Sequence, residues 1–345
     1  MKKKLNKLFD KVGIKSDRTK NITKHVLLSA IYKGGSILSS FMLVPLTINY
    51  LDTENYGVWL TLSSFIAWFA FFDIGLGNGL RNKFAEAKVK GDIKLVRGYV
   101  SSAYYTIGAL SLGLVLVFSI INFLIDWTKV FNTSPEMHKS LSILMPIVFG
   151  FFCLRLVAKL ITTIYTADQH HSMQGKINFF IQVGSLLLVW LMTKFSESSL
   201  LLFGIIYSFF PALILVALNF FAFNNRYKEF KPSINLWKKE YLKDIFGLGM
   251  KFFVIQIAKI ILFSTDNIII TQLFGPEEVV PYNIAFKYFS IVEMGLSLIL
   301  MPYWSSMTEA YTKNDFDWIK QSMKNLIKFS FLSILGIIIL LIFSN

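Results

Sequence analysis

The sequence predicts an all-α, polytopic membrane protein, and two observations carry this prediction. Of the 345 residues, 54% are hydrophobic and only 16% are charged, with a mean hydropathy of +0.55. The apolar residues also gather in long blocks, and a helix of about 20 apolar residues crosses the roughly 30 Å hydrocarbon core of a bilayer. This composition excludes a disordered chain, a fibrous repeat and most soluble enzymes.

Nine membrane spans follow when the apolar blocks are divided at clusters of charged residues. Their predicted bounds are 24–50, 57–80, 98–125, 140–165, 176–194, 199–223, 243–273, 280–310 and 321–344. The chain has one cysteine, Cys153, which excludes an intrachain disulfide and a cysteine-rich metal site. No metal and no cofactor are expected.

Basic residues alternate along the loops. The N-terminal arm and the loops after spans two and six are rich in Lys and Arg, whereas the loops after spans one and seven contain none. By the positive-inside rule, the N-terminus is cytoplasmic and the odd-numbered loops face outward. The net charge of +14 is spread over these loops and not gathered on one surface, so nucleic acid is not an expected partner.

The chain repeats itself weakly at an offset of 223 residues. The identical pairs are Glu54 with Glu277, Glu86 with Glu309, Ala87 with Ala310, Lys90 with Lys313 and Asp92 with Asp315. Spans one to three therefore correspond to spans seven to nine. Since each copy would hold six spans, both copies enter from the same side, as in the parallel repeats of transporters.

This repeat predicts two lobes, the second of them incomplete. The expected parts are a basic cytoplasmic N-terminal arm (1–23), a first six-helix lobe (24–223), a basic cytoplasmic linker (224–242) and a partial second lobe of three helices (243–345). A second copy of full length would run to about residue 469, about 124 residues beyond Asn345. The sequence is therefore expected to lack three further spans.

One stretch carries a family resemblance. Residues 49–92 read NYLDTENYGVWLTLSSFIAWFAFFDIGLGNGLRNKFAEAKVKGD, with a short acidic turn before Tyr56-Gly57-Val58-Trp59, then the run from Asp73 to Leu80, then a basic loop. This stretch resembles the N-terminal signature of the bacterial polysaccharide flippases, which are the O-antigen and oligosaccharide exporters of the multidrug/oligosaccharidyl-lipid/polysaccharide exporter superfamily.

The resemblance implies a non-enzymatic transporter with two six-helix lobes around a central cavity that opens alternately to either side. Its expected cargo is an undecaprenyl-diphosphate-linked sugar repeat unit, moved outward across the bacterial inner membrane for O-antigen, lipopolysaccharide, capsule or exopolysaccharide biosynthesis. The expected partners are this lipid-linked oligosaccharide, membrane lipids, a polysaccharide polymerase and a chain-length regulator.

Charged residues inside the spans are the best candidates for the cargo site, because a Lys, Arg or Asp near the bilayer centre costs at least about 2.5 to 3.5 kcal/mol unless it faces protein or water. The cations are Lys33, Arg155, Lys159, Lys251, Lys259 and Lys287, and the anions are Asp73, Asp266 and Glu293. The excess of cations favours an anionic cargo such as a lipid diphosphate.

Arg155 and Lys159 are the leading pair, because they are four residues apart and share a helix face. A guanidinium can bind phosphate oxygens in bidentate fashion beside a flexible ammonium. In the alternative reading, Lys159 snorkels to the cytoplasmic interface and Arg155 bonds to a neighbouring helix. Lys33, Lys251 and Lys259 complete the predicted cationic cavity.

The carboxylates inside the spans are candidates for ion binding, and two of them also have a structural interpretation. Asp73, Asp266 and Glu293 are candidates for binding a coupling proton or sodium ion, because burial can raise the pKa of a carboxylate. Asp73 could instead orient helix ends. Lys259 and Asp266 are seven residues apart, which on one helix places them on one face, either as a gate or as a structural pair.

Two other motifs are assigned to structure. Gly75, Gly77 and Gly79 form a GxGxG pattern that is expected to close span two and to allow close helix packing, because no strand precedes it as in a dinucleotide loop. His170 and His171 lie after span four near Asp168, and adjacent histidines point in different directions, so a metal site is not expected there.

Two rival functions are weighed against the flippase. A drug exporter of the same superfamily that moves cations should line its cavity with carboxylates and aromatic rings, whereas the charges here are mainly positive. A membrane-embedded polysaccharide-processing enzyme would need a catalytic group on a large outward loop, but the predicted outward loops have only about 5 to 15 residues.

Overall fold

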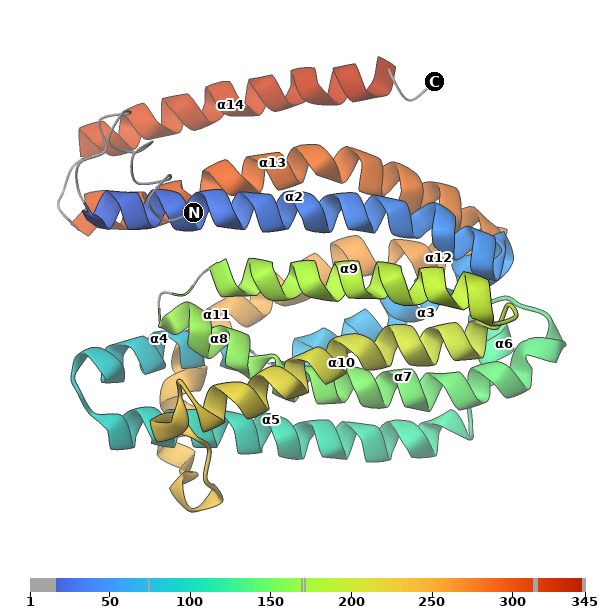
Figure 1. Cartoon of the computed structure of the whole chain (residues 1–345), viewed down its shortest axis with the longest axis horizontal. Coiled ribbons are helices and arrows are strands. Elements are labelled where there is room, and N and C mark those ends of the chain that lie inside the picture. Colours follow the sequence, from blue (N-terminus) through green and yellow to red (C-terminus); the bar gives the residue numbers. More distant parts are fainter. Residues whose placement is uncertain (1–16, 74, 169, 171, 313–315, 343–345) are drawn as a thin grey trace. The chain divides into compact units, whose positions relative to one another are not determined.

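The computed structural model describes residues 17–73, 75–168, 170, 172–312 and 316–342, with the backbone alone described at 17–30 and at parts of the helices beyond residue 247 (Figure 1). The described secondary structure is helical, without strands. The chain divides into two compact units, Met1–Val280 and Pro281–Asn345. The fold is that of an all-α membrane protein, as the composition predicts.

The first unit contains most of the helices. They are α2 (Asp17–Leu51), α3 (Thr53–Trp68), α4 (Leu76–Val89), α5 (Ile93–Asn122), α6 (Trp127–Val130), α7 (His138–Ala158), α8 (Leu160–Ala167), α9 (Ser172–Phe195), α10 (Leu200–Asn224), α11 (Lys239–Ser264) and α12 (Asp266–Phe274). Short 3₁₀ helices join them: η1 (Phe69–Asp73), η2 (Pro135–Met137), η3 (Lys228–Phe230), η4 (Ile234–Leu236) and η5 (Pro276–Glu278). The second unit consists of most of α13 (Val279–Thr312) and of α14 (Phe316–Ile342).

Seven helical segments of the described residues are long and apolar enough to cross a membrane. They are Ile31–Leu51, Thr53–Asp73, Ile93–Asn122, Pro135–Ala167, Met173–Phe195, Leu200–Asn224 and Phe316–Ile342. These segments confirm predicted spans one to six and nine, while α11 with α12 and α13 occupy the positions of predicted spans seven and eight. The chain is a multi-pass membrane protein.

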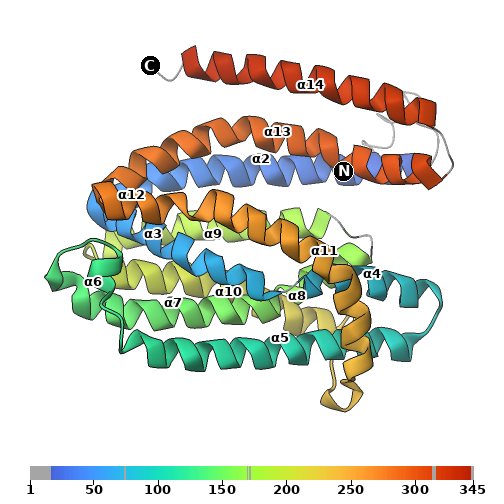
Figure 2. The same ribbon diagram turned by 180° about the vertical axis from the view of Figure 1, so that it is seen from behind.

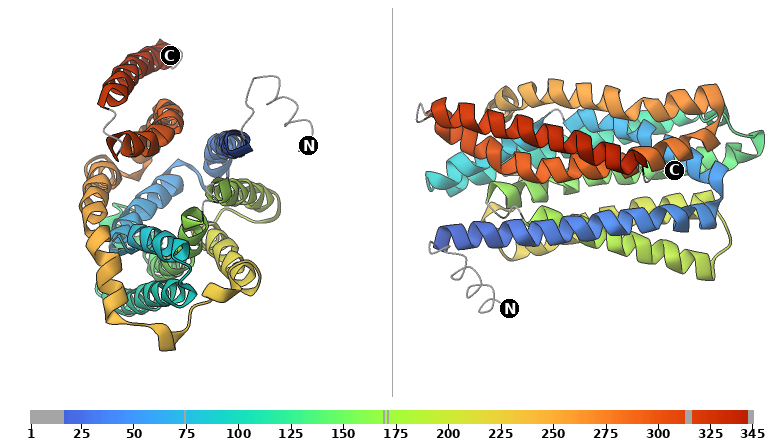
Figure 3. Two further views of the ribbon diagram at one scale, coloured as in Figure 1. Left: turned by 90° about the vertical axis from the view of Figure 1, so that its left-hand side faces the viewer. Right: turned by 90° about the horizontal axis from the view of Figure 1, so that it is seen from above.

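Aromatic rings fill the core of the first unit. In this unit α5, α7 and α10 lie side by side and α2 packs along α9 (Figures 1 and 2), and the left view of Figure 3 shows these helices end-on. Phe149 of α7 stacks on Phe118 of α5 with ring centroids 4.0 Å apart, and Trp127 lies fully buried beside them. Large flat rings give these helices extensive contact area without polar groups to satisfy.

The second span ends earlier than the sequence predicts. Membrane helix α3 passes into η1 at Phe69, and the glycine segment opens the separate helix α4 instead of closing the span. Gly75 begins α4 in the left-handed conformation with φ of 69°, which glycine adopts without steric cost. The basic residues expected in a loop after span two, such as Lys83 and Lys88, therefore lie on a helix.

Close packing by the glycine segment is confirmed at Gly79. A Cβ atom at this position would lie 2.1 Å from the backbone oxygen of Ile245, so only glycine allows α4 to approach α11 so closely. This contact attaches the first helix of the second copy to the first lobe, at the end of the bundle that the charge rule places in the cytoplasm.

Element boundaries coincide under the offset of 223 residues. The end of α2 at Leu51 corresponds to the end of α12 at Phe274, and the start of α5 at Ile93 corresponds to the start of α14 at Phe316. The turn residue after the first helix has a positive φ in both copies, 70° at Asp52 and 99° at Gly275. The two segments thus share their turn geometry as well as their sequence pattern.

The copies differ at one place. In the second copy α13 continues through the region that corresponds to η1 and the start of α4. Leu298 and Leu300 stand at the positions that correspond to Gly75 and Gly77. A leucine in the left-handed conformation is strained, so the helix continues where glycine would allow it to break.

The predicted linker is docked on the first lobe. Its backbone amides at Ser233 and Lys238 donate to the hydroxyls of Ser101 and Ser102 on α5, at 3.0 and 3.1 Å. Arg97 Nε donates to the carbonyl oxygen of Lys231 at 2.8 Å. These bonds run along one face of α5 and position the start of α11.

The orientation of the spans is tested by cysteine labelling. Cys153 is 1% exposed and would first be replaced by alanine. A cysteine at Ser134, in the turn before α7, should react with an impermeant thiol reagent in intact cells. A cysteine at Asp92, between α4 and α5, should react only after the cells are opened. Both residues are exposed, but the charge rule places them on opposite sides of the membrane. Labelling of the Asp92 site in intact cells would reverse the topology.

Candidate functional site

Arg155 and Lys159 form an exposed cationic pair within a membrane span. The backbone amide of Lys159 donates to the carbonyl oxygen of Arg155 at 2.9 Å, so the side chains lie one helical turn apart, as their spacing predicts. Both residues are exposed. Arg155 lies 12 residues before Ala167, where the span ends, which is about 18 Å at 1.5 Å per residue. Such a depth requires a polar surrounding.

Aromatic and amide side chains hold this part of α7 in place. Tyr207 of α10 interacts electrostatically with Arg155 and packs with its ring centroid 5.6 Å from that of Trp59. Asn219 Nδ2 donates to the carbonyl oxygen of Ala158 at 2.7 Å, beside the point where α7 ends and α8 begins. Tyr104 in turn donates to Asn219 Oδ1 at 2.6 Å. The backbone at the helix junction is thereby satisfied without the two cations.

No carboxylate of the described residues lies within ion-pair distance of Arg155 or Lys159. Tyr207 of the neighbouring helix α10 does interact electrostatically with Arg155, so the alternative in which Arg155 bonds to a neighbouring helix stays open beside the cargo site. The pair offers two positive charges, one of them a planar fork of donors, to a ligand.

The other predicted cations are placed on different elements. Lys33 is half-buried on α2, two residues from Gly35, which contacts Phe179 of α9. Lys251 and Lys259 lie on α11, but their side chains fall outside the described residues. Lys287 is half-buried on α13, in the other unit. The part that Lys33, Lys251 and Lys259 play in a cationic cavity stays a prediction.

The predicted carboxylates are also dispersed. Asp73 Oδ1 accepts a bond from the backbone amide of Gly77 at 3.1 Å, so it orients the start of α4, as its structural alternative supposed. Asp266 is the first residue of α12 and follows a break at Thr265, so one continuous helix face shared with Lys259 does not exist. Glu293 is exposed on α13. Their binding of a coupling ion remains a prediction.

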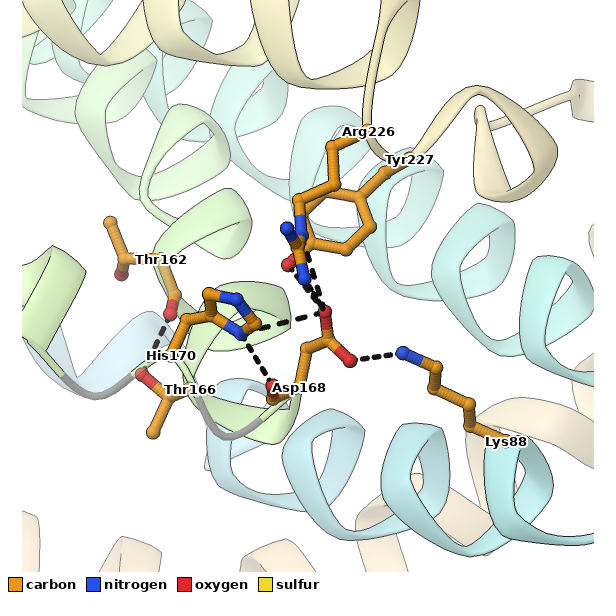
Figure 4. Close-up of polar contacts among 7 residues, drawn as sticks. All are labelled: Lys88, Thr162, Thr166, Asp168, His170, Arg226 and Tyr227. Carbon is orange, nitrogen blue, oxygen red and sulfur yellow. Dashed lines mark hydrogen bonds and ion pairs between the residues drawn. The ribbon is translucent and has the colours of Figure 1, made fainter. Parts of the chain in front are cut away.

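A cluster around Asp168 was not foreseen (Figure 4). Its carboxylate accepts bonds from Lys88 of α4, from Arg226 at 3.1 Å and from the Tyr227 hydroxyl at 3.0 Å, and His170 Nδ1 lies 2.6 Å from its backbone oxygen. These residues come from three segments of the chain: α4, the end of α8 and the end of α10. The available signal was that Asp168 lies on the same predicted side of the membrane as the cation-rich segments after spans two and six, which hold Lys88 and Arg226.

Asp168 stays charged because its donors outweigh its burial. Its side chain is 10% exposed, and burial alone raises the pKa of the carboxyl group. The bonds from Lys88, Tyr227 and Arg226 lower the pKa by more than burial raises it, so the pKa lies below the usual value. The cluster fastens α4, the end of α8 and the end of α10 to one another.

Comparisons of the sequence with known proteins match a polysaccharide biosynthesis family and proteins named for O-antigen export or transport. A family model described as polysaccharide biosynthesis protein matches residues 22–308. A protein of Yersinia pseudotuberculosis named for O-antigen export is 25% identical over 327 residues, covering 91% of this chain and 72% of the relative. A Salmonella typhi protein named for O-antigen transport is 22% identical over 325 residues, covering 92% and 71% of the two chains.

A solved structure shares the fold. It is an inward-facing conformation of a multidrug resistance transporter of the MATE family in the MOP superfamily, with a TM-score of 0.65 and 13% identity. The similarity covers 90% of this chain and 68% of the other. The two chains thus share a fold.

The Asp168 cluster predicts a pH-dependent stability difference. The pKa of Asp168 in the folded chain is below its usual value of about 3.9. The ionised carboxylate therefore stabilises the fold fully at pH values above about 3.9, and this stabilisation is lost as the pH falls through the lowered pKa. Asp168→Asn should lower the melting temperature of the detergent-solubilised protein at pH 7, by roughly 2 to 4 °C for each kcal/mol by which the free energy of unfolding falls. The same difference should shrink toward pH 3. Equal melting curves at pH 7 would show that the cluster contributes nothing.

Proposed function

Because this chain belongs to the polysaccharide biosynthesis protein family, we propose that it is a flippase that moves undecaprenyl-diphosphate-linked oligosaccharide outward across the bacterial inner membrane, with its N-terminus in the cytoplasm. The observation that carries the proposal is the exposed Arg155–Lys159 pair within a membrane span. The names of the relatives, O-antigen export and O-antigen transport, support the class of cargo.

The pair suits a diphosphate in both charge and shape. A lipid diphosphate carries two adjacent phosphates, and the guanidinium of Arg155 can form two parallel bonds to the oxygens of one of them. Lys159, one turn nearer the predicted cytoplasmic end, can reach the other phosphate as a flexible point charge. An anionic group in turn lowers the cost of keeping two cations inside the membrane region.

The charge sign separates this function from its rivals. The likeness to a multidrug transporter concerns the fold and does not choose a cargo. A cation exporter would be opposed by the two cations at Arg155 and Lys159, which have no carboxylate partner in the part of the chain that the structure describes. A glycan-processing enzyme would need an activated nucleophile or an acid–base pair, whereas the groups described here bind and position an anion.

Substitution of Arg155 tests the proposal without knowledge of the sugars. The purified Arg155→Ala variant should bind undecaprenyl diphosphate at least about tenfold more weakly than the wild type, a loss of about 1.4 kcal/mol, because the bidentate contact is gone. Arg155→Lys should recover part of the affinity, since it keeps the charge and loses the fork. Dissociation constants measured in detergent at fixed ionic strength decide this.

Leu154→Ala is the matched control, because Leu154 is the adjacent exposed residue on α7 and carries no charge. It should bind the diphosphate as the wild type does. In cells that depend on this chain for O-antigen export, Arg155→Ala should reduce surface glycan at unchanged protein level. Full affinity and full export in Arg155→Ala would refute the anion site.

A further inference from the structure

The basic linker projects sideways from the helices of the first unit. It leaves α10 at Asn224, passes through η3 and η4, and enters α11 at Lys239. In Figures 1 and 2 it extends past α5, and the end-on view of Figure 3 shows it at the margin of the first unit. Membrane helices run across the bilayer, so a segment that projects at right angles to them runs parallel to the membrane surface.

Hydrogen bonds fix the level at which the linker crosses α5. Its backbone is bonded to the hydroxyls of Ser101 and Ser102, and the indole Nε1 of Trp237 donates to Thr106 Oγ1 at 3.0 Å. The linker therefore lies beside residues 101–106 of α5 and is held there by both backbone and side-chain bonds.

This level is the edge of the hydrocarbon core. Helix α5 has 30 residues and is about 45 Å long at 1.5 Å per residue, whereas the core is about 30 Å thick, so about ten residues lie outside it. Lys94 and Arg97 stand near the start of α5, whereas Phe123 and Leu124, just after its other end, are apolar and exposed. The excess length therefore lies at the start, and residues 93–102 stand in the headgroup region.

The linker exposes apolar side chains at this level. Ile234 is 59% exposed, and Trp237 is 43% exposed while its indole N–H stays bonded to α5. Tryptophan is enriched where a membrane meets water, because its ring is apolar and its N–H is polar. At the boundary between headgroups and acyl chains both side chains leave water, which stabilises the linker in that position.

Cations surround these apolar side chains. Residues 224–243 contain six Lys and Arg against two Glu. Lys231, Lys238 and Lys239 are exposed, and within the described part of the chain no carboxylate lies at ion-pair distance from them. Lysines beside exposed apolar side chains are typical of segments that lie in the membrane interface and attract anionic lipid.

We propose that the linker is a binding site for anionic phospholipid. Ile234 and Trp237 enter the boundary between headgroups and acyl chains, and Lys231, Lys238 and Lys239 contact the lipid phosphates. The site is separate from the Arg155–Lys159 pair, which lies within a span, and it does not depend on the cargo. The bonds to α5 hold the linker at the level of the headgroups.

The first experiment measures whether the linker lies in the membrane. A cysteine at Asn235, in a Cys153→Ala background, carries a bimane label, and the full chain is reconstituted into vesicles of phosphatidylcholine and phosphatidylglycerol. Asn235 is exposed and adjoins Ile234, so both apolar side chains remain. Lipid with a spin label near its headgroup should quench the bimane fluorescence, because the label lies among the headgroups.

The matched control is the same label at Asp92, which is also exposed and lies about 15 Å before Ser102 along α5. Its fluorescence should persist, because this position stands in water beyond the headgroups. An Asn235 label that is quenched no more than the Asp92 label would mean that the linker lies in water or against another protein, and would overturn the lipid site.

The second experiment tests the role of charge. The Asn235-labelled chain in neutral detergent is titrated with short-chain phosphatidylglycerol, and the bimane emission reports binding. Lys231→Gln with Lys238→Gln should weaken the apparent affinity on the order of 10- to 30-fold, since each lysine near a membrane surface contributes to binding of anionic lipid. Both substitutions keep the backbone bonds to α5. Salt should weaken binding to the wild type, and phosphatidylcholine of equal chain length should bind more weakly.

Lys83→Gln with Lys90→Gln is the control, because it removes the same charge from α4 on the same predicted side of the membrane. It should leave the affinity unchanged. Equal affinity of the Lys231/Lys238 variant and the wild type, an equal loss in the control, or equal binding of the two lipids would each overturn the site. Neither experiment uses glycan, so its outcome is independent of the proposed function.

Discussion

The structure depends on the inability of hydrocarbon to bind polar groups, so that each polar group within a span must find a partner in the protein. Asn219 shows how this is met: it donates to the carbonyl oxygens of Ala158 and Leu215 and accepts from Tyr104, so one side chain joins α5, α7 and α10. The helix junction beside Lys159 is stable because of this network. The backbone at this junction is therefore satisfied without the side chains of Arg155 and Lys159.

The sequence predicted what depends on local pattern. Blocks of apolar residues gave the spans, and a spacing of four gave the common face of Arg155 and Lys159. It failed where a helix breaks without a strong local signal. Ser264 to Asp266 contains neither proline nor glycine, so Lys259 and Asp266 were assigned to one helix, and the end of span two was placed seven residues beyond Asp73.

Contacts between distant segments could not be predicted at all. Thr61 and Thr271 are 210 residues apart, and Asp168 and Arg226 are 58 apart, and neither pair leaves a mark in the periodicity of its own helix. The stripe of Gly57, Thr61 and Ser64 does depart from an apolar lipid-facing pattern. It indicates that α3 has a protein neighbour, but the identity of that neighbour is a property of the fold.

The Asp168 cluster and the contacts between α3 and α12 are held by hydrogen bonds of different strength. The Asp168 cluster uses charged groups, whose hydrogen bonds contribute about 1.5 to 3 kcal/mol each, less where water screens them. The contacts between α3 and α12, such as the Thr61–Thr271 and Ser64–Asn267 hydrogen bonds, use neutral hydroxyls and amides at about 0.5 to 1.5 kcal/mol each. Small polar residues on α3 and α12 therefore fix which groups meet across this contact, while the charged groups of the Asp168 cluster supply the stronger individual bonds.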